Sequence, residues 1–295
     1  MSSCPHVTGE SIVAGVFGWP IKHSLSPIMH NAAFVEAGLS WIYVPFEVHP
    51  EKLGSALRSL PSLGIVGVNL TIPHKEKAVP YMDVLTTEAS QIGAINTVHS
   101  LSEIGLLGDN TDGDGFYYPL SQSGFEVGGR SALILGAGGA ARAVAFRLAK
   151  AGAKLIIANR TLLRATALAE DVSNVYPTAV PQLLPLEESS LEHAVQEVCL
   201  IVNTTRIGMH PDTNQIPPIP LHSLRRNTLV YDLVYNPIET LLLKEARKLG
   251  CKTVDGVHML AGQGAASWER WTGRKAPRDV MEQAVREELN TRTLA

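Results

Sequence analysis

The segment 132–142 has the residue types and spacing of a dinucleotide-binding turn. Four apolar residues lead into a run of glycines, and a helical pattern follows. Gly136 allows a tight turn, Gly138 lets the backbone approach a pyrophosphate, and Ala141 is small enough for a helix to pack closely on the preceding strand. The free N–H groups and the dipole at the helix start favour an anion. We therefore expect a nucleotide to contact Gly136, Ala137, Gly138, Gly139 and Ala140.

The end of the next apolar run, 154–158, indicates which nucleotide. An NAD site usually has Asp or Glu at this position, whereas this chain has Asn159 and Arg160, with Arg164 one helical turn later. Two guanidinium groups suit a phosphate. The alternative is a pair of solvated surface cations, but cations are disfavoured at a helix start unless an anion is near. NADP is therefore the expected cofactor, with contacts from Asn159, Arg160, Thr161 and Arg164.

Polar side chains recur at strand ends in the first half of the chain. In an open parallel sheet these ends border the ligand crevice, so together they could line a pocket for a small hydroxylated acid. Each has an ordinary structural alternative: Ser26 and Asp112 as helix N-caps, Lys75 as a surface lysine, the asparagines as partners of nearby backbone. The set comprises Ser24, Ser26, Asn69, Thr71, Lys75, Asn96 and Asp112.

Lys75 and Asp112 are the one plausible acid–base pair in this set. Hydride transfer to a carbonyl leaves an alkoxide that needs a proton. A lysine ammonium can supply that proton, and a carboxylate can orient the lysine. The ten histidines lack metal-ligand spacing, so no metal is expected.

The elements that must position these residues alternate between strand and helix. In the first half, the pattern predicts strands at 11–18, 41–48 and 65–72, helices at 28–37 and 52–60, a helix from 73, and a hairpin at 95–99 and 105–108. This order predicts a mostly parallel sheet. A helix to Gly124 follows Asp112, and we place the domain boundary there.

The strand–helix alternation resumes at 132. Strands are expected at 132–135, 154–158, 199–203, 228–233 and 252–254, a further strand near 178–180, loop and short helix at 182–196, and helices at 239–249, 258–272 and 280–289. No strand follows the last helices, so they could return to the first domain. The fold expected is α/β with two domains: an N-terminal substrate domain, residues 1–112 plus 256–295, and a Rossmann-like NADP-binding domain, residues 113–255.

Composition excludes several function classes. A net charge of −3 gives no general attraction to nucleic acid. The chain lacks a signal-peptide pattern and an apolar run long enough to span a bilayer. Cys4, Cys199 and Cys251 show no pairing or metal spacing, which suits a reducing compartment. A cytoplasmic protein is expected.

The chain combines several motifs between about residues 13 and 271: Ser24-Leu-Ser-Pro27, Asn69-Leu-Thr-Ile-Pro-His-Lys75, Gly93-Ala-Ile-Asn-Thr97, Gly108-Asp-Asn-Thr-Asp-Gly113, Gly136-Ala-Gly-Gly-Ala-Ala141, Asn159-Arg-Thr161, Asn203-Thr-Thr205 with Gly208-Met209, Asp232-Leu-Val-Tyr235 and Gln263. In this combination the sequence resembles the shikimate dehydrogenase family, NADP-dependent enzymes of the pathway to aromatic amino acids.

The resemblance implies a role for each matching residue. Lys75 would be the acid–base group beside Asp112, and Ser24 and Ser26 would bind the substrate carboxylate, with Tyr235 near it. The ring hydroxyls would contact Asn69, Thr71, Asn96, Asp112 and Gln263. The cofactor would also contact Thr204, Met209, Leu233 and Gly256. Arg206 departs from the family pattern, where a small or uncharged residue is more usual.

The expected reaction is reversible reduction of 3-dehydroshikimate by NADPH in a monomer or homodimer. One alternative is a quinate/shikimate dehydrogenase with relaxed use of NAD and NADP. Relatives that favour quinate tend to lose a serine from the Ser-x-Ser-Pro loop, whereas Ser24 and Ser26 are both present. Another is a nucleotide-binding regulator without catalysis, against which the intact Lys75 and Asp112 argue.

Overall fold

A computed structural model describes residues 6–294, which form two compact units. One unit comprises residues up to Gly115 together with those from Leu260 onward, and the other runs from Phe116 to Met259. Both divisions fall inside helices, α5 and α10, whose first residues are Asp112 and Gly256. The expected limits, 112/113 and 255/256, lie at the starts of these same helices.

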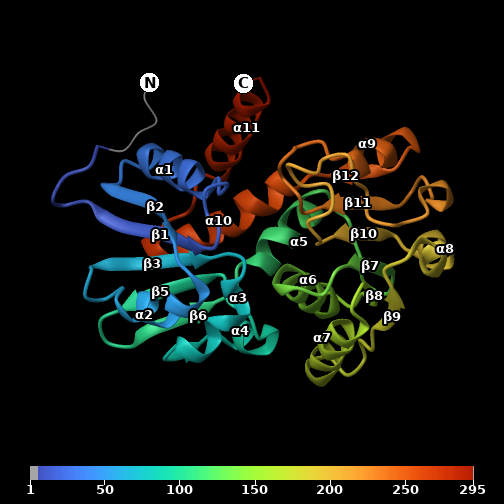
Figure 1. Cartoon of the computed structure of the whole chain (residues 1–295), viewed down its shortest axis with the longest axis horizontal. Helices are drawn as coiled ribbons and strands as arrows, with labels where there is room; N and C mark the ends of the chain where they lie inside the picture. Colours follow the sequence, from blue (N-terminus) through green and yellow to red (C-terminus); the bar gives the residue numbers. More distant parts are fainter. Residues whose placement is uncertain (1–5, 295) are drawn as a thin grey trace. The chain divides into compact units, whose positions relative to one another are not determined.

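The first unit contains a mixed sheet of six strands in the order β2-β1-β3-β5-β6-β4 (Figure 1). β2, β1 and β3 are parallel, whereas β5 is antiparallel to both β3 and β6. The strands are β1 (Ile12–Gly18), β2 (Trp41–Glu47), β3 (Ile65–Leu70), β4 (Val84–Leu85), β5 (Thr97–Leu101) and β6 (Gly105–Asp109).

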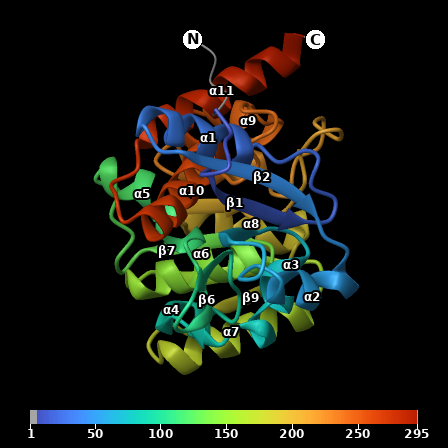
Figure 2. The same ribbon diagram turned by 90° about the vertical axis from the view of Figure 1, so that its left-hand side faces the viewer.

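Helices from both ends of the chain complete this unit. α11 packs on α1, as Figures 1 and 2 show, so the last helices return to the first domain as the sequence predicts. α4 and the short β4 were not predicted. The helices are α1 (Ser26–Glu36), α2 (Leu53–Arg58), α3 (His74–Lys77), α4 (Thr87–Ile92), α10 (Gly256–Thr272) and α11 (Arg278–Leu294), and α5 (Asp112–Gln122) begins here.

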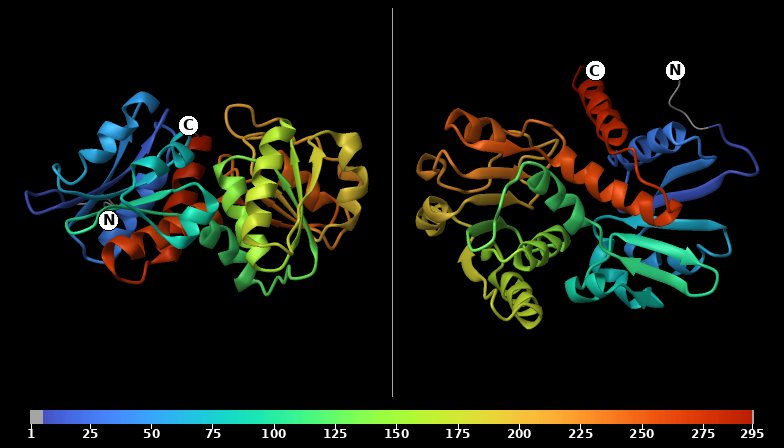
Figure 3. Two further views of the ribbon diagram at one scale, coloured as in Figure 1. Left: turned by 90° about the horizontal axis from the view of Figure 1, so that it is seen from below. Right: turned by 180° about the vertical axis from the view of Figure 1, so that it is seen from behind.

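The second unit contains a fully parallel sheet in the order β12-β11-β10-β7-β8-β9. Helices lie along both sides of this sheet in Figure 3. The order reverses at β7, as in a doubly wound dinucleotide-binding fold. The elements are β7 (Ser131–Leu135), α6 (Gly139–Lys150), β8 (Lys154–Asn159), α7 (Leu162–Val175), β9 (Gln182–Pro185), α8 (Glu188–Glu197), β10 (Leu200–Asn203), β11 (Leu229–Asp232), α9 (Leu241–Lys248) and β12 (Lys252–Val254).

One prediction for this unit is wrong. No strand lies at 178–180; the edge strand is β9, within the segment expected to be loop and short helix. β9 pairs in parallel with β8, and its four residues include no fully buried side chain. A short, half-exposed edge strand has little hydrophobic pattern, which is why periodicity did not find it.

Both units have apolar cores, but that of the first unit encloses an unusual histidine. His30 of α1 is fully buried, its ring is stacked on Tyr43 at 4.2 Å between centroids, and it contacts Trp271. Neither ring nitrogen has a hydrogen-bond partner among the described residues. Burial lowers the pKa of His30 from 6.5 to about 3, because the charged ring would lose its hydration. The imidazole is therefore neutral in the folded protein at ordinary pH.

His30 should make the first unit sensitive to acid. Below pH 6.5 the unfolded chain protonates this ring while the folded chain does not, so stability falls by about 1.4 kcal/mol per pH unit. His30→Phe keeps an aromatic ring but cannot titrate. Between pH 7 and pH 5 the unfolding free energy of the wild type should fall by about 2 kcal/mol more than that of the variant.

Urea unfolding followed by tryptophan fluorescence measures this difference. All four tryptophans, Trp19, Trp41, Trp268 and Trp271, belong to the first unit, so the signal reports on that unit. Equal pH dependence in wild type and variant would mean that His30 does not carry the effect.

Candidate active site

Polar residues from three adjacent strands meet at one end of the first unit's sheet. Asn69 of β3 pairs with Thr97 of β5, which in turn pairs with Asp109 of β6. Since β5 is antiparallel, its first residue lies beside the last residues of its neighbours. Asn96 was expected inside a strand at 95–99, but that prediction is wrong: Asn96 directly precedes β5, which begins at Thr97. The reversed strand delivers it to the edge where the carboxyl ends of β1, β3 and β6 lie.

Lys75 and Asp112 form an ion pair at this edge. Their side chains are 18% and 3% exposed, respectively, so the lysine retains access to solvent while the carboxylate is enclosed. The Lys75 carbonyl accepts the N–H of Ile95, which anchors α3 beside the segment that carries Asn96. Asn110 Oδ1 accepts the N–H of Asp112. Backbone contacts thus fix both partners of the pair.

Asn96 connects this pair to the rest of the site. Its Nδ2 lies within 3.1 Å of Asp112 Oδ1, Gln263 Oε1 and Thr111 Oγ1, and its Oδ1 accepts the N–H of Thr111 at 2.8 Å. Asp112 therefore receives Lys75 on one carboxylate oxygen and Asn96 on the other. Only 1% of Asn96 is exposed, so water does not compete for its amide. The hydrogen bonds of this amide therefore orient Asp112 and Gln263.

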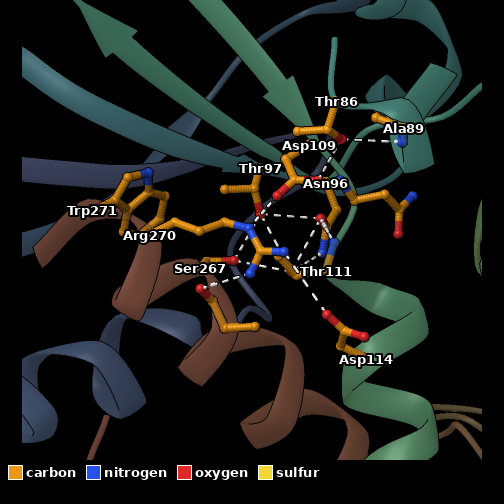
Figure 4. A network of polar contacts seen from close by, with 12 residues as sticks. Thr86, Ala89, Asn96, Thr97, Asp109, Thr111, Asp114, Ser267, Arg270 and Trp271 are labelled. Atoms are coloured by element: carbon orange, nitrogen blue, oxygen red, sulfur yellow. Dashed lines mark hydrogen bonds and ion pairs between the residues drawn. The ribbon is translucent and has the colours of Figure 1, made fainter. Parts of the chain in front are cut away.

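Ser267 of α10 links the three strand ends; Figure 4 shows it beside Thr97 and Thr111. Its fully buried hydroxyl lies 2.9 Å from Asn69 Nδ2, 2.7 Å from Thr97 Oγ1 and 3.1 Å from Thr111 Oγ1, and it donates to the Gln263 carbonyl. The sequence analysis missed Ser267, Thr97 and Thr111. Ser267 follows Gln263 by four residues and so shares its helix face, a spacing that could have identified it.

Two glycines allow α10 to approach this edge. A Cβ on Gly115 would lie 2.4 Å from the backbone nitrogen of Gln263, and one on Gly262 would lie 2.9 Å from the Gly115 Cα. Only glycines permit helices α5 and α10 to come this close. The contact brings the half-buried Gln263 side chain against Asn96.

Ser24 lies on the loop after β1, and Ser26 is the first residue of α1. Ser24 is half-buried, and its Oγ accepts the N–H of Ser26 at 3.3 Å. α1 begins at Ser26 with Leu25 as the N-cap residue, so the reading of Ser26 as an N-cap is wrong. The hydroxyl of Tyr43 donates to Asn69 Oδ1, and burial raises the Tyr43 pKa well above its usual value, opposed by a hydrogen bond from Ser26. Tyr43 thus joins Ser26 to Asn69.

Thr71 follows β3 and is half-buried at the same edge. Its N–H donates to Phe17 O of β1, and its carbonyl accepts the N–H of His74 at the start of α3. The first unit therefore brings strand ends, helix starts, the loop after β1 and the middle of α10 to one sheet edge. The residues are Ser24, Ser26, Asn69, Thr71, Lys75, Asn96, Asp112 and Gln263.

The glycine turn of the second unit fits a pyrophosphate. Gly136 has φ of +114°, and a Cβ there would lie 2.5 Å from Thr204 Oγ1, so only glycine suits the position. Gly138 caps α6, and a Cβ there would meet open space, which leaves the helix N-terminus accessible. Thr204 Oγ1 donates to Leu135 O at 2.6 Å, which fixes the turn beside β10.

Arg160 and Arg164 flank the start of α7. Both are exposed, and neither side chain forms an ion pair with a residue in the described part of the chain. Thr161 is the N-cap residue without a side-chain cap bond, and the amide of Asn159 donates to Thr161 O at 2.8 Å. Two unpaired cations therefore stand where the helix dipole favours an anion.

The remaining predicted residues lie on loops of the second unit. Met209 and Leu233 are half-buried, as is Tyr235, and Arg206 is exposed. A Cβ on Gly256 would lie 2.5 Å from Leu233 O, so glycine is required for this close contact.

The loop after β11 is shaped by Asp232, which the sequence analysis did not single out. Its carboxylate accepts hydrogen bonds from Asn203 Nδ2, Val234 N–H and Thr240 Oγ1. Burial raises the pKa of Asp232 to about 6, although these three donors oppose the shift. The bond to Val234 fixes the backbone between Leu233 and Tyr235.

Several other features bear on what the chain can bind. Within residues 6–294, no group of three or more His, Cys, Asp or Glu side chains could hold a metal, and no helix is long and apolar enough to cross a membrane. Cys199 and Cys251 are buried free thiols, and Cys4 lies outside the described residues.

Three family models match the chain. They are the shikimate dehydrogenase substrate binding domain at residues 16–98, shikimate / quinate 5-dehydrogenase at 120–206, and the shikimate 5'-dehydrogenase C-terminal domain at 256–286. The chain is 45% identical to the shikimate dehydrogenase (NADP(+)) of Moorella thermoacetica, over 96% of this chain and 95% of the relative.

Solved structures agree with these matches. A shikimate dehydrogenase in complex with NADP+ has a TM-score of 0.90 at 40% identity, over 97% of this chain and 98% of the other. A Thermus thermophilus shikimate 5-dehydrogenase in complex with NADP(H) and shikimate has a TM-score of 0.83 at 39% identity, over 94% of this chain and 99% of the other. A Corynebacterium glutamicum quinate dehydrogenase in complex with NAD has a TM-score of 0.85 at 30% identity, over 93% of this chain and 98% of the other. With nearly full-length identity above 40% to its relative from Moorella, the chain belongs to the shikimate dehydrogenase family.

Proposed function

We propose that this chain catalyses the NADP-dependent interconversion of shikimate and 3-dehydroshikimate. The observation that carries the proposal is the Lys75–Asp112 ion pair, enclosed by hydroxyl and amide side chains at one sheet edge. Such a surrounding suits a polyhydroxylated ring better than an apolar substrate. The Moorella relative is named as a shikimate dehydrogenase (NADP(+)), and the Thermus structure contains NADP(H) and shikimate, which supports the proposal.

The chain's own residues would bind the substrate and move one proton. Bound NADPH would supply the hydride that reduces the ring carbonyl. Lys75 Nζ would then give its proton to the carbonyl oxygen, and in the oxidative direction the same nitrogen would take the hydroxyl proton. Asp112 would hold Lys75 in place, since the carboxylate is itself fixed by Asn96. General acid–base groups of this kind typically contribute about 10²–10⁴-fold to the rate.

The other residues would recognise the two ligands. Ser24 and Ser26 would donate hydrogen bonds to the substrate carboxylate, with Tyr235 as a further contact. Asn69, Thr71, Asn96 and Gln263 would meet the ring hydroxyls. In the second unit the glycine turn would hold the pyrophosphate and Arg160 with Arg164 the 2′-phosphate, while Asn159, Thr161, Thr204, Met209, Leu233 and Gly256 would line the cofactor.

Nicotinamide absorbance distinguishes this activity from the alternatives. The protein should reduce NADP+ with shikimate far faster than NADP+ with quinate or NAD+ with shikimate. Comparable rates with quinate and shikimate would favour a quinate/shikimate dehydrogenase. One of the similar solved structures is a quinate dehydrogenase in complex with NAD. No turnover with either substrate would favour a non-catalytic nucleotide-binding regulator. A cytoplasmic location and a monomeric or homodimeric state are proposals that cell fractionation and light scattering would test.

Lys75→Ala should lower kcat by about 10²–10⁴-fold, because the variant lacks the proton donor. A rise in KM for shikimate would also agree with this role, since Lys75 would donate a hydrogen bond to a substrate hydroxyl. Lys77→Ala is the matched control: it removes an exposed lysine from the same short helix. Initial rates and thermal melting of both variants are the measurements. Near-normal kcat in a folded Lys75→Ala protein would remove Lys75 from the mechanism.

Replacing both Arg160 and Arg164 by alanine should abolish the preference for NADP. Each charge-assisted contact to the phosphate is worth roughly 10- to 10²-fold in affinity, and the two losses need not add. Because the phosphate is remote from the reacting carbon, KM for NADP+ should rise while kcat stays nearly unchanged. Affinity for NAD+ should barely change.

The control for this pair is Lys244→Ala with Lys248→Ala, which removes the same charge from α9 of the same unit. Titration of NADP+ and NAD+ into the three proteins gives the affinity ratio. If that ratio is the same in the arginine double variant and the wild type, the assignment of the 2′-phosphate site is wrong.

A further inference from the structure

The GDNTDG turn that delivers Asp112 (residues 108–113) is fixed at its second residue, Asp109, by an arginine from near the other end of the chain. Arg270 of α10 forms an ion pair with Asp109, the last residue of β6, while its Nη1 donates to Ala266 O (Figure 4). The Asp109 side chain is 9% exposed. A carboxylate so enclosed needs a charged or strongly hydrogen-bonded partner to remain favourable.

A continuous set of hydrogen bonds leads from this ion pair to the Lys75–Asp112 pair. Asp109 Oδ1 accepts the N–H of Asn110 at 2.7 Å and the hydroxyl of Thr86 at 2.7 Å. Asn110 Oδ1 accepts the N–H of Asp112 at 3.1 Å, and Asn110 Nδ2 donates to Ala94 O. Asn110 and Thr111, the residues between β6 and Asp112, are thus each held by hydrogen bonds to neighbouring side chains. Arg270 is the cation that pairs with Asp109 at the beginning of this set of contacts.

We propose that Arg270 is a positioning residue: by pairing with Asp109 it sets the geometry of the Asn110–Asp112 turn and thereby the placement of Lys75. The inference rests on the proposed function. Arg270 touches neither Lys75 nor Asp112, so its effect passes through Asp109 and Asn110, and through Asp114 of α5, whose carboxylate lies 3.8 Å from the other guanidinium nitrogen, Nη2. A shift of the catalytic pair of about 1 Å can cost on the order of 10²-fold in rate.

The cavity beside Arg270 allows a direct chemical test. A space of about 260 Å³ is lined by Thr86, Thr97, His99, Leu107, Asp109 and Arg270 itself. Arg270→Ala would enlarge this space at the place beside the Asp109 carboxylate that the guanidinium group now fills. Added guanidinium ion, which reproduces the missing group, could enter there and pair with Asp109 at concentrations too low to unfold the protein.

The wild type is first assayed with shikimate and NADP+; absence of turnover would refute the proposed function and not this inference in particular. If turnover is present, Arg270→Ala should lower kcat by about 10- to 10²-fold, with KM for NADP+ unchanged. Millimolar guanidinium chloride should restore part of the lost kcat, and sodium chloride at equal concentration should not. Arg270→Lys should retain more kcat than Arg270→Ala.

Arg286→Ala is the matched control. It removes an arginine that pairs with Glu282 on α11 of the same unit and whose side chain is 29% exposed, against 34% for Arg270. Its kcat should stay at the wild-type value with or without guanidinium. The inference is overturned if Arg270→Ala has wild-type kcat, or if guanidinium raises its kcat no more than it raises that of Arg286→Ala.

Discussion

The structure depends on one constraint: several polar side chains are buried together at a single sheet edge, and each must find a partner there. Asn69, Thr97 and Thr111 all lie within hydrogen-bond distance of the Ser267 hydroxyl, and all four are at most 5% exposed. An unpaired polar group in such a place would cost a few kcal/mol. The packing of α10 on this edge is therefore not interchangeable with packing by an apolar helix.

This constraint also prepares the site for chemistry. Because Asn96 and Lys75 hold the two oxygens of Asp112, the carboxylate has little freedom left to lose when a substrate binds. Groups that are already oriented need no reorganisation at the moment of proton transfer. The same argument explains the close contact between Gly115 and Gly262, since a larger residue at either position would push Gln263 away from Asn96.

Sequence reasoning recovered the elements with strong periodicity and the residues whose chemistry is visible locally. The glycine turn and the strand before it could be read from Gly136 and its apolar flank, because a φ of +114° demands glycine. The Lys75–Asp112 pair, too, could be expected from residue type. Membership of the family, its two-domain α/β fold and NADP as the cofactor of its relatives agree with the expectations.

What the sequence could not supply depends on contacts between distant segments. Asn96 was assigned to the interior of a strand because its neighbours are apolar; its true place follows from the antiparallel pairing of β5, which no local pattern specifies. Ser26 resembles an N-cap, yet the helix begins one residue earlier than that role requires. Arg270 and Asp109 are far apart in the chain, so their pairing was invisible before the fold was known.

The most direct test of this account is a crystal structure of the wild-type protein with shikimate and NADP+. We expect one ring hydroxyl within about 3.2 Å of both Lys75 Nζ and a carboxylate oxygen of Asp112. The hydrogen bonds of Ser267 to Asn69, Thr97 and Thr111 should be unchanged, since a pre-organised site shifts by less than about 1 Å on binding. Shikimate bound without contact to Lys75, or a site in which these hydrogen bonds form only with shikimate present, would contradict it.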